Sequence, residues 1–100
     1  MIYNIEYFFE WNPKKATSNY SKHNVSFEEA TTIFKDSNIV SIYDNSHSEY
    51  EDRWISIGLS EFGKLLIVCH TFREIDIKNS RIRIFSTRKA TKAEINQYKE

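Results

Sequence analysis

His23 is the first residue of this chain whose type and position could do chemistry. It follows Lys22 near the end of a predicted helix. There an imidazole could move a proton near neutral pH, and the neighbouring ammonium could hold a phosphate. The alternative is a structural role, in which the histidine cation stabilises the helix C-terminus through the macrodipole. Spacing alone favours the structural role.

A second group of cations lies between residues 78 and 92, a stretch without an acid. Arg81, Arg83 and Phe85 recur at every second position, so a strand would place them on one face of a sheet. A cationic row beside an exposed aromatic ring suits a phosphodiester backbone and a stacked base. The alternative, which composition alone favours, is an ordinary solvated face paired with nearby acids. The basic residues are Lys78, Arg81, Arg83, Arg88, Lys89 and Lys92.

His70 is a third candidate, in the middle of a predicted strand. It could be a hydrogen-bonded sheet histidine or a surface catalyst, and the sequence leaves both open. The neighbouring Cys69 lies in an apolar run and is typical of a buried thiol rather than a nucleophile. Trp11 and Trp54 are more typical of core anchors than of ligand platforms.

The overall charge is balanced, with 14 basic and 14 acidic residues among 100 and a formal net charge of zero. This balance argues against a generic basic coat for nucleic acids and against an acidic disordered tail. It is nevertheless a sum over separate regions, because residues 44–61 carry five acids and one base. A local phosphate-binding surface therefore stays compatible with zero net charge.

Several protein classes are excluded. No apolar run approaches the roughly 18 residues of a membrane span, and the N-terminus lacks the basic and apolar regions of a signal peptide. The single cysteine cannot form an internal disulfide, which fits a reducing cytoplasm. The three histidines lack zinc-finger spacing, and two glycines cannot build a glycine-rich phosphate loop. We expect one domain over residues 1–100, cytoplasmic, with no membrane segment, metal or cofactor.

Local signals predict the elements that must position these residues. Hydrophobic alternation over residues 5–11 predicts a first strand. Asn12 and Pro13 then supply a helix N-cap and a proline at the first helical position, so a helix should run from residue 13 to about residue 23. Asn24 can end this helix in the left-handed conformation.

Ser26 and Glu29 form a capping box that predicts a second helix, ending within the polar run 35–38. Its expected buried stripe is Phe27, Ala30 and Phe34. Thr91 and Glu94 form another capping box, so a short helix should end the chain near Tyr98. Between these helices, apolar runs predict strands over 39–43, 53–60, 64–77 and 81–87, separated by an acidic loop at 44–52 and by turns at 60–63 and 78–80.

The resulting order, β-α-α-β-β-β-β-α, predicts an α+β fold. We expect an antiparallel sheet with the two N-terminal helices packed on one face and a short C-terminal helix. Alternation places Ile55, Ile57 and Leu59 on one side of their strand, which we take as the core side. The same alternation puts Arg53 and Arg88 on the core side, so they would reach solvent only at strand ends.

The chain carries a series of motifs, in this order: Phe9–Lys15, Asn19, Lys22–Ala30, His47-Ser48, Glu51–Trp54, Ile57–Ser60, His70-Thr71 with Arg73, Arg81–Ile84, Ser86, Arg88–Thr91 and Glu94. Together they resemble the BrnT family of bacterial toxins. The resemblance covers nearly the whole chain from residue 9 onward. Asn12 stands where Asp is usual and Asn24 where Gly is usual, but Asn retains both the cap and the left-handed turn. The N-terminal strand and the hairpin between Arg73 and Arg81 are longer than usual.

The resemblance implies a RelE-like fold and the toxin of a type II toxin–antitoxin system. Such toxins are ribonucleases that arrest translation and growth. Their partner is a BrnA antitoxin, a ribbon-helix-helix DNA-binding protein, and the pair represses its own operon. A toxin of this kind meets operator DNA only indirectly, through the antitoxin.

On this resemblance we expect metal-independent RNA cleavage, in which the ribose 2′-OH attacks the adjacent phosphate. The reaction needs a base, an acid and cations that stabilise the phosphorane charge. His23 with Lys22 is the first choice for proton transfer and His70 the second, while Glu51 could orient Arg53. The expected phosphate cations are Arg53, Arg73, Arg83 and Arg88, and the expected RNA-binding residues are Lys14, Arg81, Arg83, Phe85 and Lys89.

Two other functions stay open at the level of sequence. The chain could be a binding module, inactive alone, that neutralises or recruits a partner. It could also be a RelE-like gyrase poison, which would induce a DNA-damage response without loss of RNA. Cleavage of cellular RNA on expression, and a neighbouring gene for a basic ribbon-helix-helix protein, would favour the toxin.

Overall fold

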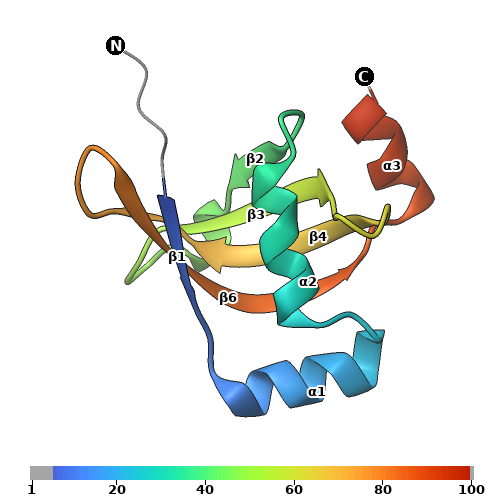
Figure 1. Ribbon diagram of the computed structural model, residues 1–100, viewed down its shortest axis with the longest axis horizontal. Helices are drawn as coiled ribbons and strands as arrows, with labels where there is room; N and C mark the ends of the chain where they lie inside the picture. Colours follow the sequence, from blue (N-terminus) through green and yellow to red (C-terminus); the bar gives the residue numbers. More distant parts are fainter. Residues whose placement is uncertain (1–5, 100) are drawn as a thin grey trace.

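Six strands and three α-helices make up residues 6–99, the part of the chain that the computed structural model describes (Figure 1). The strands form one sheet in the order β1-β6-β4-β3-β2, and β5 pairs with β6 off this path. The α+β prediction is confirmed. The strands are β1 (Glu6–Glu10), β2 (Val40–Tyr43), β3 (Arg53–Leu59), β4 (Leu65–Thr71), β5 (Arg73–Glu74) and β6 (Asn79–Lys89). The helices are α1 (Pro13–His23), α2 (Phe27–Thr31) and α3 (Lys92–Lys99), with 3₁₀ turns η1 (Thr32–Lys35) and η2 (Asn45–His47).

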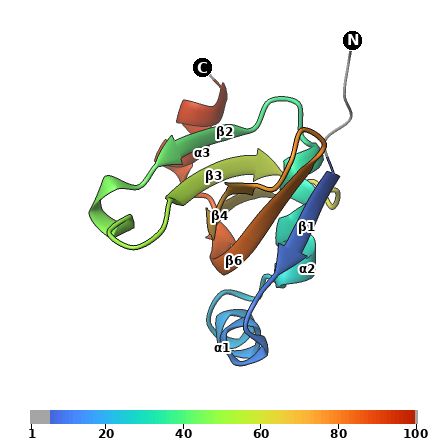
Figure 2. The same ribbon diagram turned by 90° about the vertical axis from the view of Figure 1, so that its left-hand side faces the viewer.

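The sheet is mixed, so the prediction of an antiparallel sheet is wrong at one pair. β1 runs parallel to β6, with Phe8 opposite Arg81 and Glu10 opposite Arg83 (Figure 2). The pairs β2–β3, β3–β4, β4–β6 and β5–β6 are antiparallel. A parallel pair needs a long crossover connection, and here it contains almost every other element. No local pattern in β1 identifies so distant a partner.

Capping residues set both ends of α1 where the sequence predicts them. The Asn12 side chain accepts hydrogen bonds from the backbone N–H groups of Lys14 and Lys15 at 2.9 and 3.3 Å. Asn24 adopts the left-handed conformation at φ 56°, and its N–H bonds the Tyr20 carbonyl. Both ends of α1 are therefore fixed by hydrogen bonds that span at most four residues, through the side chain of Asn12 and the backbone of Asn24.

The two N-terminal helices take different places on the sheet, rather than sharing one face. α2 lies across one face, whereas α1 runs along the sheet margin beside β6 (Figure 1). β1 pairs with β6 only as far as Arg83. Further along, the Asn19 side chain accepts from the Thr87 N–H at 3.1 Å and donates to the Thr87 carbonyl at 2.9 Å. An amide side chain thus takes the place of a neighbouring strand at this edge.

The main core lies between α2 with η1 and one face of the sheet. Phe27 and Ala30 are fully buried as predicted, whereas Phe34 is partly buried and packs at the edge of this core. The Ser26 hydroxyl caps α2 by accepting from the Glu29 N–H at 3.0 Å. The core residues are Val25, Phe27, Ala30, Ile33, Leu66, Val68, Ile82 and Ile84.

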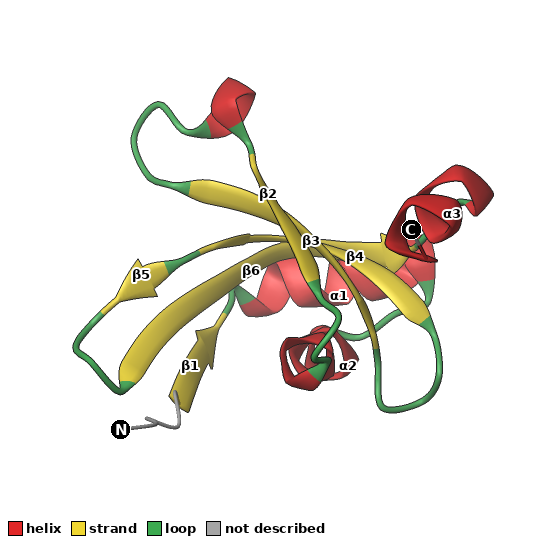
Figure 3. Ribbon diagram, turned by 90° about the horizontal axis from the view of Figure 1, so that it is seen from above, coloured by secondary structure: helices red, strands yellow, loops and turns green. Residues whose placement is uncertain are grey.

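β3 turns Trp54, Ser56 and Gly58 toward the side of α2 and η1, so the expected core side of this strand is wrong. A Cβ on Gly58 would lie 2.9 Å from the Ile33 Cβ, so η1 approaches too closely for a side chain here. Ser56 is fully buried, and the Ser60 hydroxyl donates to the Glu29 carboxylate at 2.9 Å. Ile55, Ile57 and Leu59 share the opposite face, here called the open face. Figure 3 shows α2 below the sheet and α3 above one end of it.

A bulge in β6 places Arg88 on the open face, so its predicted position on the core side is wrong. Cys69 pairs with Ser86, but the next residue, His70, pairs with Ile84, which leaves Phe85 as an extra residue in β6. Beyond the bulge the alternation reverses, so Thr87 is buried on the α2 side and Arg88 lies on the open face. Arg53 lies on the open face as well, because it pairs with Thr71 in the same register as the β3 isoleucines.

Two strand boundaries also differ from prediction. The stretch 64–77 is not one strand, because β4 ends at Thr71 and the short β5 begins at Arg73. β6 begins at Asn79, within the predicted turn. The Asp76 carboxylate accepts from the backbone N–H groups of Lys78 and Asn79, which places the turn one or two residues earlier. The Thr91–Glu94 capping box and the C-terminal helix are confirmed.

Replacing Asn19 with Ala should destabilise the protein by about 2–3 kcal/mol, because it leaves the buried N–H and C=O of Thr87 without partners. Urea unfolding followed by circular dichroism measures this. The control Ser18→Ala, at the exposed neighbouring position of α1, should change stability by less than about 0.5 kcal/mol. Equal stabilities for both variants would contradict the role of Asn19.

Candidate functional site

Arg53 and Arg83 meet on the open face from two different strands. Arg53 at the start of β3 lies opposite Thr71 of β4, and the Thr71 hydroxyl accepts from the Arg83 N–H of β6 at 3.0 Å. The two arginines therefore flank the end of β4. Their side chains are 37% and 41% exposed, so both guanidinium groups can reach solvent.

Three cationic side chains lie around the ring of Phe85. The Arg53 guanidinium carbon lies 4.2 Å from the ring centroid, that of Arg83 5.0 Å, and the Lys15 ammonium 5.5 Å. All three are within cation–π range. Because Phe85 is the bulged residue, its ring stands at the point where β6 passes from β1 to α1. We call Phe85 with Arg53, Arg83 and Lys15 the Phe85 cluster.

The carboxylate of Glu51, from the loop before β3, contacts two arginines of the Phe85 cluster. Both Glu51 oxygens accept hydrogen bonds from Nη2 of Arg83. Nη2 of Arg53 donates to the same carboxylate at 3.4 Å. The remaining Arg53 Nε is buried and has no hydrogen-bond partner within the described residues. The predicted contact of Glu51 with Arg53 is present, and its contact with Arg83 is closer.

Helix α1 brings His23 and Lys22 to the same ring. These two residues line a shallow hollow with Lys15 and Phe85, completed by Ser18, Asn19 and Ser86. His23 is half-buried and Lys22 is exposed. The hollow adjoins a second one, formed by Asn12, Lys15, Arg53, Arg83, Ile84 and Phe85. A histidine, two lysines and two arginines thus border one continuous surface.

Arg73 and Arg81 extend this surface on the far side of Arg83. They are Cα partners on β5 and β6, and both are exposed. With Arg83 they line a polar hollow that also contains acids from neighbouring loops and strands. Those acids are Glu10, Glu51 and Asp52. This part of the surface is therefore of mixed charge, unlike the side next to α1.

Arg88 lies on the open face but is engaged by α3. Its guanidinium makes two parallel hydrogen bonds to the Glu94 carboxylate, at 2.8 and 2.9 Å. This pairing lowers the pKa of Glu94 to about 2. Lys89 is exposed at the end of β6, and Lys14 is exposed in the first turn of α1. Neither lysine lines the hollows around Phe85.

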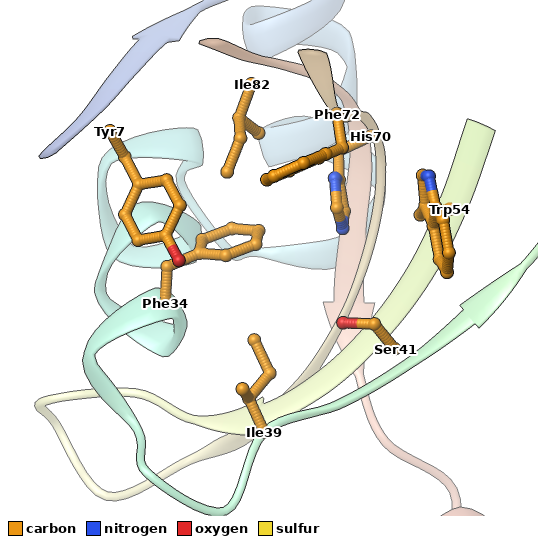
Figure 4. Close-up of a pocket in the computed structure, with 8 residues that line it drawn as sticks. All are labelled: Tyr7, Phe34, Ile39, Ser41, Trp54, His70, Phe72 and Ile82. Carbon is orange, nitrogen blue, oxygen red and sulfur yellow. The ribbon is translucent and has the colours of Figure 1, made fainter. Parts of the chain in front are cut away.

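His70 is separated from these residues by the sheet. It is 2% exposed on the α2 side, where one ring nitrogen lies 2.7 Å from the Ser56 hydroxyl and the other 2.7 Å from the Thr71 carbonyl. Its ring stands edge-on to Phe34, and burial lowers the pKa of His70. It borders an apolar cavity of about 240 Å³ with Tyr7, Phe34, Ile39, Ser41, Trp54, Phe72 and Ile82 (Figure 4).

Lys15 is a residue of this surface that the sequence analysis did not single out. Lys15, Asn19 and Lys22 recur at steps of four and three, which places them on one face of a helix. That spacing could have indicated Lys15 from the sequence. No glycine marks the bulge that turns Phe85 toward α1, and its trace in the sequence is the break in alternation at Ile84-Phe85.

Together, fold and site define a small α+β protein whose sheet carries cations around one aromatic ring, a chemistry suited to phosphodiester chains. The chain belongs to the BrnT family. Residues 11–94 match the family model of the BrnT ribonuclease toxin of type II toxin–antitoxin systems. The resemblance drawn from the motifs is thereby confirmed, and membership in this family implies an antitoxin partner. None of the curated proteins matches the chain. No helix within residues 6–99 is long and apolar enough to cross a membrane.

The pair of Arg88 and Glu94 should make stability depend on pH. The folded pKa of Glu94 is about 2, below the ordinary value of 4.5, so ionised Glu94 stabilises the fold above pH 4.5. That contribution is lost as the pH falls from 4.5 through about 2. We expect the melting temperature of Glu94→Gln to lie below that of the parent near neutral pH and to converge with it in acid. Thermal unfolding across pH measures this.

The matched control is Glu61→Gln, at an exposed position in the turn between β3 and β4. Its melting temperature should follow that of the parent throughout. If the difference in melting temperature between Glu94→Gln and the parent stays constant down to pH 2, the ion pair is not the source of that difference.

Proposed function

We propose that this protein is an endoribonuclease toxin that cleaves RNA at the Phe85 cluster without a metal or cofactor. The observation that carries the proposal is the convergence of Arg53, Arg83 and Lys15 on one ring beside His23. The family supports ribonuclease chemistry. The cations supply what an RNA phosphate needs, and His23 supplies a group that can transfer a proton.

In the proposed reaction the ribose 2′-oxygen attacks the adjacent phosphorus in line with the bond to the 5′-oxygen. A base removes the 2′-OH proton, the P–O5′ bond breaks, and an acid delivers a proton to the leaving 5′-oxygen. The products are a 2′,3′-cyclic phosphate and a 5′-OH. Negative charge grows on the non-bridging oxygens, so preorganised cations lower the barrier.

Arg53 and Arg83 are proposed to hold those oxygens, because both side chains are partly exposed at the same place. Phe85 keeps the two guanidinium groups together despite their like charge, since the face of the ring attracts each of them. His23 serves in proton transfer and Lys22 holds a flanking phosphate. His70 is left out of the reaction, because it is buried on the other side of the sheet.

The remaining cations are assigned supporting roles. Arg73 and Arg81 continue the surface along β5 and β6, and Lys14 and Lys89 lie further out, so these four would contact the RNA backbone away from the cleaved bond. Arg88 is already paired with Glu94, so we assign it to the attachment of α3 rather than to catalysis.

The wider setting is also part of the proposal. We take residues 1–100 as a single toxin domain with a RelE-like fold, acting in the cytoplasm to inhibit translation and growth. A BrnA-like ribbon-helix-helix antitoxin would neutralise it and connect it to operator DNA. Family membership supports the antitoxin partner.

Expression without antitoxin, followed by mapping of RNA 5′ ends, tests this function. The parent should arrest growth and produce new 5′-OH ends, and its cleavage in vitro should persist in EDTA. Arg53→Ala, Arg83→Ala and His23→Ala should each lower cleavage by about 10²-fold, the usual cost of removing one transition-state contact. Lys64→Ala, which removes an exposed cation at the opposite end of the sheet, should cleave like the parent.

Other outcomes would contradict the proposal in distinct ways. Growth arrest with a DNA-damage response and intact RNA would indicate a gyrase poison. No growth inhibition and no RNA cleavage would indicate a binding module. Full cleavage by all three alanine variants would place the active site elsewhere.

A further inference from the structure

The Glu51 carboxylate contacts both of the arginines that the proposed function assigns to the RNA phosphate. Its two carboxylate oxygens both accept from Nη2 of Arg83, and Arg53 lies within 3.4 Å of the same group. Within the described residues, no other carboxylate hydrogen-bonds either guanidinium group. Each arginine therefore already holds an anion before any RNA arrives.

A carboxylate and a phosphate compete for the same guanidinium N–H donors, because each presents a pair of anionic oxygens that the planar fork of arginine donors can hold. Resting on the proposed function, we propose that Glu51 is a built-in competitor for the RNA phosphate. RNA binds at the Phe85 cluster by displacing the Glu51 carboxylate from Arg83. Glu51 thus sets how tightly the toxin holds any phosphodiester chain.

The loop around Glu51 is built for such a displacement. Ser48 fixes the base of the loop, since its hydroxyl accepts from the Arg53 N–H at 3.0 Å and bonds the Asp44 carbonyl. The residues between, Glu49 and Tyr50, are exposed, Tyr50 by 92%. Glu51 belongs to no strand or helix and is 34% exposed. Its side chain can leave the arginines without disturbing the core.

Partial exposure also limits how strongly the pair resists displacement. Arg53, Arg83 and Glu51 each keep about a third or more of the side chain in solvent. Ion pairs this exposed are weak, because water and salt screen them. A phosphate that also contacts Lys15 or Lys22 has more cationic partners than the single carboxylate does. Glu51 therefore lowers the affinity of the site for RNA but does not prevent RNA from binding.

The test uses the full-length protein and a fluorescent oligodeoxynucleotide, which lacks the 2′-OH and cannot be cleaved. Glu51→Gln should bind this probe about 3- to 10-fold more tightly than the parent, as expected for release of an exposed ion pair. Its affinity should also fall more steeply with salt, because more cations are available to phosphates. Fluorescence anisotropy at several salt concentrations measures both.

Glu49→Gln is the matched control. It makes the same change in net charge two residues away, in the same exposed loop. A general effect of charge would tighten binding equally in both variants, whereas release of the arginines predicts less than about twofold for Glu49→Gln. Equal affinities for the two variants, or weaker binding by Glu51→Gln, would overturn the inference.

Arg83→Ala separates this inference from the proposed function. It should weaken binding of the probe, and the gain from Glu51→Gln should shrink to the control level in the double variant Glu51→Gln/Arg83→Ala. If Arg83→Ala binds like the parent, the proposed phosphate site is wrong and this inference falls with it. If Arg83→Ala weakens binding while Glu51→Gln matches the control, only the competitor role is refuted.

Discussion

The extra residue that β6 carries at Phe85 decides which side chains reach each face of the sheet. Before the bulge, Ile82 and Ile84 pack under α2, and Arg83 points to the open face. After it, the alternation reverses, so Thr87 is buried. Without the bulge, Ser86 would take the place of Thr87 opposite Val68, and Arg88 would turn toward the α2 side of the sheet opposite Leu66, at a large desolvation cost. Because of the bulge, β6 contributes buried residues on both sides of Phe85 and still presents arginines on the open face.

The contacts between α1 and β6 contribute both to stability and to the arrangement of the candidate site. β1 pairs with only the first part of β6, and Asn19 of α1 satisfies the edge of the rest through Thr87. That attachment places the Lys15 and Lys22 side of α1 next to Phe85. A helix tied to a strand edge through one amide therefore also sets the distance between a candidate proton-transfer residue and the arginines.

The fold shows how a net charge of zero is compatible with a local cationic site. The basic stretch near the end of the chain supplies cations to the open face, and two of its six cations are already paired, Arg88 with Glu94 and Arg83 with Glu51. Other acids of the loop before β3 bond locally, Asp44 with His47 and Asp52 with Tyr43. The molecule therefore combines a concentrated cationic site with little long-range field, which limits non-specific attraction to nucleic acid.

Local capping made α1 and α3 predictable from sequence, because Asn12, Asn24 and the Thr91–Glu94 pair act within three or four residues of themselves. The motifs also identified the BrnT family, and they named arginines that the fold brings together. Which face of β3 is covered, which strand pairs with β1, and where β6 bulges were decided only by tertiary structure. Alternation shows that a strand has two faces, but contacts between residues far apart in the chain choose which one is buried. The approach of Ile33 to Gly58 makes that choice for β3, and it turns Arg53 toward Phe85.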